Sequence, residues 1–75
     1  MADFINRVTE HFDELTKSHK EVANYFLYNL DKVAVGTLED LAGLVGVSTT
    51  TVIRFARQLG YSGFTELQKD AQNIV

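Results

Sequence analysis

Apolar positions recur along this chain at helical spacing, and no useful length of it alternates apolar and polar residues as a strand would. The first apolar stripe, which predicts a helix over about residues 2–16, consists of Phe4, Ile5, Val8, Phe12 and Leu15. Ser18 and Glu21 have the spacing of a capping box, in which both side chains pair with otherwise unpaired amides. A second helix is therefore expected from about residue 19 to 32, followed by a connector over residues 33–36.

Two short helices are expected in the middle of the chain. Thr37 opens the first, over residues 38–45, and Gly46 closes it in a left-handed conformation that glycine adopts without a Cβ penalty. Ser48 caps the second, over residues 49–59. A three-residue turn containing glycine between two helices is typical of a helix-turn-helix motif, in which the helices cross steeply.

The last helix is expected to begin near Phe64, after Gly60 has closed the preceding one. Apolar or small residues stand at the positions that the motif must bury, and they are Leu41, Ala42, Val45, Val47, Val52, Phe55, Ala56 and Leu59. The sequence thus predicts an all-α, five-helix bundle with a helix-turn-helix over about residues 37–60. A plain helical hairpin inside a bundle is the alternative, but it would not need the glycine-centred spacing.

Composition fits one compact domain of 75 residues without cysteine, so the core must hold the fold without disulfides. The apolar stretches are far shorter than the roughly 20 residues that span a bilayer, and the start of the chain lacks the apolar run of a signal peptide. We therefore expect a soluble, cytoplasmic protein without membrane contact.

Charge is distributed unevenly along the chain. The net charge is −3, yet no acid occurs between Leu41 and Thr65, where the only formal charges are Arg54 and Arg57. If the chain binds a polyanion such as DNA, we expect it to bind through this segment. The overall acidity instead favours a second hypothesis, a protein-interaction or oligomerisation module that does not contact DNA.

The outward positions of the helix over residues 49–59 provide the candidate DNA contacts. Arginine can donate two parallel hydrogen bonds to guanine, hydroxyls at a helix start can bind phosphate, and an isolated isoleucine can contact a thymine methyl group. The predicted DNA-binding residues are Ser48, Thr49, Thr50, Ile53, Arg54 and Arg57. For each there is also a structural reading, as helix cap, solvated side chain or edge of the core.

Other chemistry has little support in the sequence. His11 and His19 lie on different expected helices with no third metal ligand at suitable spacing, and the serines occupy caps or turns. The glycines are too scattered to form a phosphate-binding loop. We therefore expect no enzymatic activity, no metal and no cofactor.

The segment VSTTTVIRFARQLGYSGFTEL, residues 47–67, resembles the N-terminal DNA-binding domain of the RpiR family of bacterial transcriptional regulators. The likeness rests on the capping Ser48, the pair Arg54-Phe55, the step Leu59-Gly60-Tyr61 and the helix start Gly63-Phe64. Residues 15–25 and 38–42 give weaker support. The sequence departs from the family at His19, where glutamate is frequent, and at Gln68, where lysine could contact phosphate.

The resemblance implies a homeodomain-like fold of the RpiR N-terminal type, in which residues 1–75 form the helix-turn-helix domain. It also implies a homodimeric or larger regulator that binds a double-stranded DNA operator under the control of a phosphosugar. The phosphosugar would bind a C-terminal sugar-isomerase-like (SIS) domain, expected in the full-length protein and absent from these residues. Four aromatic residues are candidates for either dimer contact or core packing, and they are Phe4, Phe12, Tyr25 and Tyr28.

Overall fold

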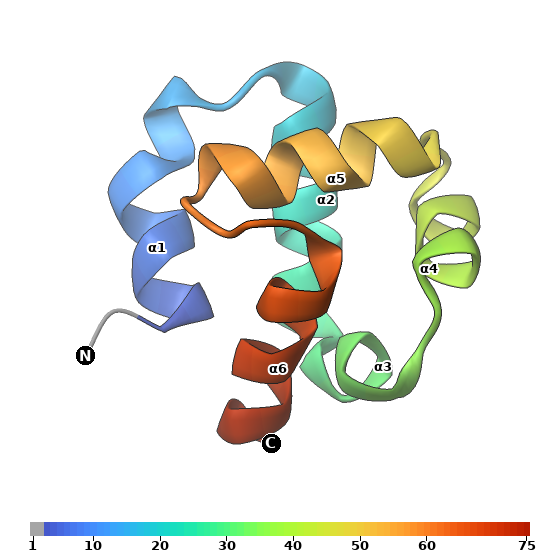
Figure 1. Cartoon of the computed structure of the whole chain (residues 1–75). Helices are drawn as coiled ribbons and strands as arrows, with labels where there is room; N and C mark the ends of the chain where they lie inside the picture. Colours follow the sequence, from blue (N-terminus) through green and yellow to red (C-terminus); the bar gives the residue numbers. More distant parts are fainter. Residues whose placement is uncertain (1–2) are drawn as a thin grey trace.

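The computed structural model describes residues 3–75, and these are folded into helices joined by short turns. The elements in chain order are α1 (Phe4–His11), the single 3-10 turn η1 (Phe12–Glu14), α2 (Lys17–Tyr28), α3 (Leu30–Val35), α4 (Leu38–Val45), α5 (Thr49–Gln58) and α6 (Phe64–Ile74). The all-α prediction is confirmed, although the described residues form six α-helices where five were expected. Figure 1 shows α5 lying across the molecule in front of α2, between α1 at one end and α4 at the other.

Three phenylalanine rings form the centre of the core. Phe4 of α1, Phe26 of α2 and Phe55 of α5 are completely buried, and their ring centroids lie 5.9 to 6.3 Å apart. Rings at this separation and tilt add roughly 0.5–1.5 kcal/mol per pair beyond the area that they bury. The inner face of α5 is therefore held against both N-terminal helices.

The first helix ends earlier than the apolar stripe predicts. α1 stops at His11, and Thr16 rather than Ser18 caps α2, because the Thr16 hydroxyl accepts a hydrogen bond from the His19 amide at 3.2 Å. Both residues have a suitable oxygen, but Leu15 is buried with an extended backbone, which places the end of the irregular segment at Thr16. For this reason α2 begins at Lys17, two residues before the start expected from the sequence.

The connector predicted over residues 33–36 is also wrong, because most of it belongs to α3. Asn29 interrupts the helical backbone, and α3 then buries Val33 in the core. Gln68 of α6 donates hydrogen bonds from Nε2 to the carbonyl oxygens of Val33 at 3.1 Å and Gly36 at 2.7 Å. The glutamine that departs from the family pattern therefore satisfies the carbonyl end of α3, a role that the local sequence around α3 does not reveal.

The four aromatic residues do not form one surface. Phe4 belongs to the core, and Phe12 and Tyr25 are partly buried against it, so core packing is the correct explanation for these three. Tyr28 is 86% exposed at the end of α2.

Candidate nucleic-acid interface

The turn between α4 and α5 has the geometry expected of a helix-turn-helix. Gly46 has a φ of 91°, in the left-handed region, and the amides of Gly46 and Val47 donate to the carbonyl of Ala42 at 2.9 and 3.0 Å. Val47 packs partly buried against the core, and Ala42 is buried in it. The predicted glycine closure and the inward positions of this turn are confirmed.

The first turn of α5 is capped by Ser48. The Ser48 Oγ accepts a hydrogen bond from the Thr51 amide at 3.1 Å and lies 3.0 Å from the Thr51 hydroxyl. The amides of Thr49 and Thr50 have no intrahelical partner by helix geometry, and an anion is stabilised at such a helix start. Thr50 is exposed and Thr49 is partly buried. The cap and the candidate phosphate site therefore lie together at this end of α5.

The two faces of α5 differ in burial. Val52, Phe55 and Ala56 are completely buried, whereas Arg54 and Arg57 are exposed on the opposite side and Ile53 is partly buried between the two faces. Burial of the inner face fixes the rotation of the helix about its axis. The outer face is thus presented to solvent by a rigid core.

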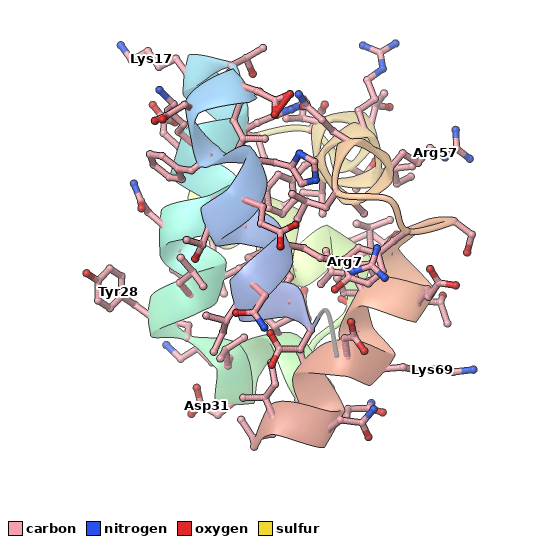
Figure 2. The ribbon with its side chains drawn as sticks, turned by 90° about the vertical axis from the view of Figure 1, so that its left-hand side faces the viewer. Arg7, Lys17, Tyr28, Asp31, Arg57 and Lys69 are labelled. Atoms are coloured by element: carbon pink, nitrogen blue, oxygen red, sulfur yellow. The ribbon has the colours of Figure 1, made fainter. Side chains whose placement is uncertain are left out.

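Neither arginine is neutralised within the part of the chain that the structure describes. Across residues 3–75, the Arg54 side chain makes no hydrogen bond and no ion pair. Arg57 donates from Nε to the carbonyl of Ser62 at 3.3 Å and makes no ion pair with a described residue. In Figure 2, Arg57 projects away from the ribbon on the same side as Lys69, while Tyr28 and Asp31 project from the other side. A cationic outer face is therefore available to a polyanion.

A second left-handed glycine ends α5. Gly60 has a φ of 96°, its amide donates to the Arg57 carbonyl at 2.9 Å, and the Tyr61 amide donates to the Ala56 carbonyl at 3.1 Å. This pair of bonds is the Schellman closure of a helix C-terminus. The next acid in the sequence, Glu66, accepts a hydrogen bond from the Ser62 amide at 3.2 Å and so connects the first turn of α6 to the loop before it.

Contacts from other helices hold this end of α5, and sequence reasoning missed them. Arg7 of α1 donates from Nη1 to the Leu59 carbonyl at 3.0 Å, and its guanidinium carbon lies 4.4 Å from the centroid of the Tyr61 ring. The Tyr61 hydroxyl donates to Asp70 Oδ2 at 2.6 Å. Burial, reinforced by this bond, raises the pKa of Tyr61 well above its usual value. Only the glycine-aromatic pair of residues 60 and 61 indicated a special turn here.

His19 of α2 also holds the end of α5. Its Nδ1 lies 2.7 Å from Gln58 Oε1, and Gln58 Nε2 donates to the Glu14 carbonyl at 3.3 Å. The His19 ring meets Phe55 edge-on at a centroid distance of 6.0 Å. His19, one of the two residues that depart from the family pattern, thus contacts α5 and supports it structurally.

The described residues contain no other arrangement typical of a chemical site. Within residues 3–75, no three histidine, cysteine or carboxylate side chains are grouped so that they could hold a metal ion. No helix in the same range is long and apolar enough to cross a membrane.

Two capped helices joined by a short turn with a left-handed glycine, on an all-α core, are typical of the class of helix-turn-helix domains. The chain belongs to the rpiR family of helix-turn-helix domains, whose model matches residues 2–72. The family resemblance seen in the sequence is confirmed, together with the association of this family with DNA binding and transcription regulation.

Named bacterial relatives agree with this assignment. The chain is 36% identical over 62 residues to the helix-turn-helix transcriptional regulator YfhH of Escherichia coli, covering 83% of the chain and 22% of YfhH. It is 34% identical over 68 residues to the regulator HexR of Pseudomonas aeruginosa, covering 91% of the chain and 24% of HexR. The chain therefore spans less than a quarter of the length of these relatives.

A solved structure confirms the fold. The NanR protein of Vibrio vulnificus, determined in complex with ManNAc-6P, superposes with a TM-score of 0.89 at 28% identity. The likeness covers 96% of this chain and 28% of the NanR chain.

Proposed function

We propose that this chain is the DNA-reading domain of an RpiR-type transcriptional regulator and that α5 binds the major groove of an operator. The observation that carries this proposal is the division of α5 into a fully buried inner face and an outer face with Arg54 and Arg57, neither in an ion pair with a described residue. Guanidinium groups on a rigid helix are well suited to guanine edges and to phosphate. The family membership supports the same role.

The residues of α5 would divide this work. Ser48, Thr49 and Thr50 lie at the helix start, where free amides and hydroxyls would position the helix on a phosphate and the nearest bases. Ile53 would contact a thymine methyl group, and Arg54 and Arg57 would provide most of the base or phosphate contact energy. Each bidentate arginine contact discriminates between bases by roughly 1–3 kcal/mol.

The complete regulator is proposed to act as a homodimer controlled by a phosphosugar. Two copies of the domain would read half-sites about 34 Å apart, one turn of the duplex. A C-terminal SIS domain would bind the phosphosugar, which fits the phosphosugar seen with the relative NanR. Such a protein would act in the cytoplasm.

A protein-interaction module without DNA contact is the second candidate, and the net charge of −3 favours it. The two functions differ in their response to salt, because DNA binding releases condensed counterions and weakens steeply as salt rises. A duplex selected from a random-sequence pool by the wild-type chain is the probe for both.

Arg54→Ala and Arg57→Ala test the proposal directly. We expect each to weaken binding of the selected duplex by about tenfold in a fluorescence anisotropy titration, while thermal stability changes by less than about 0.5 kcal/mol, as is usual at the surface. Lys32→Ala is the matched control, since it removes one exposed cation from α3, at the far end from α5 in Figure 1. Normal binding by both arginine variants would rule out α5 as the reading helix.

A further inference from the structure

Arg7 makes two contacts with the turn that follows α5, although it lies on α1. Its Nη1 donates to the carbonyl of Leu59, 52 residues away in the sequence, and its guanidinium stacks on the ring of Tyr61 at 4.4 Å. The Leu59 carbonyl is one of those that a helix end leaves without an intrahelical partner. A cation at this position is also favoured by the helix dipole. Arg7 is therefore a capping group for α5 supplied by another helix.

The turn is shaped to admit this arginine. A Cβ at residue 60 would lie 2.8 Å from Arg7 Nη1, so the glycine gives the left-handed turn and also the room for the guanidinium. Tyr61 is buried beneath the arginine, and its hydroxyl is fixed by Asp70 of α6. Arg7 thus connects α1, the end of α5 and α6 at one point.

Arg57 meets the same turn. It donates from Nε to the carbonyl of Ser62, which directly follows Tyr61. The segment from Leu59 to Ser62 is thus contacted by Arg7 from the body of the domain and by Arg57 from the exposed face of α5. The carbonyl that accepts the hydrogen bond of Arg57 therefore belongs to the same short turn that Arg7 contacts.

We propose that Arg7 is a positioning residue for DNA reading, which holds the turn after α5 so that Ser62 orients the guanidinium of Arg57. This inference rests on the proposed function of α5. Arg7 acts here through Leu59 and Tyr61 and not by touching the duplex. Its effect on DNA binding consequently depends on the presence of Arg57.

A double-mutant cycle tests this dependence. Arg7→Met keeps an unbranched side chain and removes the charge and the donors. We expect it to weaken binding of the selected duplex about tenfold in the wild-type background and less than about twofold in the Arg57→Ala background, as for residues that act as one unit. If Arg7→Met weakened DNA binding by the same factor in both backgrounds, the inference would be overturned. Unchanged DNA affinity combined with a lowered melting temperature would also overturn it, because that result indicates a purely structural contact.

Lys20→Met is the matched control. Lys20 Nζ lies 5.3 Å from the centroid of the Phe12 ring, so this variant also removes a cation from an aromatic ring in the N-terminal part of the domain. We expect less than about a twofold change in affinity in either background. Should Arg7→Met not fold, Arg7→Lys goes through the same cycle, since lysine keeps the charge but not the planar fork.

A measurement without DNA separates this inference from the proposed function. In ¹⁵N-edited NMR spectra of the free chain, Arg7→Met should shift the Arg57 Nε–H and Ser62 amide resonances, and Lys20→Met should leave them in place. A wild-type chain that binds no duplex would refute the proposed function while this measurement still decides the role of Arg7. Unchanged Arg57 and Ser62 resonances in Arg7→Met would refute the positioning.

Discussion

The turns at the two ends of α5 both contain a left-handed glycine but have different surroundings. Gly46 and Gly60 have φ values of 91° and 96°, and in both turns the following amide donates to a carbonyl five residues earlier. A Cβ at residue 46 would meet no atom within 4 Å, whereas one at residue 60 would lie 2.8 Å from Arg7. The local sequence thus specifies both turns, but only the Gly60 turn is also held by a distant side chain, that of Arg7.

The two ends of α5 therefore differ in how far other helices hold them. The start of α5 is left open, with Thr50 exposed beside the capping Ser48. The end of α5 is fixed by Arg7 and by His19. An anchored end gives the helix a defined direction while the open end remains available for contact.

Loss of Phe55 should have the largest effect, because this ring lies at the centre of the core. Phe55→Ala removes a fully buried side chain in contact with Phe4, Phe26 and His19. We expect a loss of about 3–5 kcal/mol in the free energy of unfolding measured by urea denaturation. A domain of this size has roughly 4–11 kcal/mol in total, so much of its stability would be lost.

The control for this prediction is Leu44→Ala. Leu44 is an apolar residue of α4 that is 59% exposed, and its loss should change stability by less than about 0.5 kcal/mol. In Phe55→Ala, hydrogen exchange at the Gly46 and Gly60 amides should accelerate together. Faster exchange at only one of the two would contradict a shared core.

The parts of the fold that the sequence predicts correctly are those whose signals are local. A left-handed glycine at residue 46 followed by a capping Ser48 defines a turn within a few residues, and the burial pattern of α5 follows its period. The start of α2 and the existence of α3 depend instead on Leu15 entering the core and on Gln68 reaching the carbonyls of α3. Such contacts between distant residues leave no periodic pattern.

The candidate site divides in the same way. The exposure of Arg54 and Arg57 follows from helical period once the inner face of α5 is known. The anchoring by Arg7 does not, because 52 residues separate this arginine from the carbonyl that it caps. In the sequence Arg7 is one charged residue on an amphipathic helix.

Alanine at the two glycines should sharpen the comparison between the turns. An alanine in the left-handed conformation is less stable by about 1 kcal/mol or somewhat more. We therefore expect Gly46→Ala to lower the free energy of unfolding by about that amount. Gly60→Ala should lose about 2 kcal/mol, because its Cβ also displaces the Arg7 guanidinium. Thermal unfolding followed by circular dichroism measures both.

The same pair of variants in an Arg7→Met background isolates the arginine. In that background the two glycine-to-alanine substitutions should lower the free energy of unfolding by equal amounts, since the Arg7 guanidinium that distinguishes the two turns is absent. A difference that persists in this background would mean that another feature of the second turn accounts for it.

Tyr61 provides the smallest and most selective test of the anchored end. Burial, and then the hydrogen bond to Asp70, raises the pKa of Tyr61, so the folded state keeps a proton that the unfolded state loses above its usual pKa of about 10. The resulting stabilisation is complete below about pH 10 and is lost as the pH rises further. By pH 11 we expect Tyr61 alone to account for a loss of about 1 kcal/mol.

Tyr61→Phe isolates this contribution. At pH 7 the free energy of unfolding of the variant should be lower by about 1 kcal/mol, because Asp70 no longer receives the hydrogen bond that the Tyr61 hydroxyl donates at 2.6 Å. When the pH is raised from 7 to 11, the free energy of unfolding should fall by about 1 kcal/mol less in the variant than in the wild-type chain. The reason is that the variant has no phenol that titrates at this position. Urea denaturation at both values measures the difference. Equal losses in the two proteins would show that the Tyr61 proton does not stabilise the turn, and the anchored end would then rest on Arg7 and His19 alone.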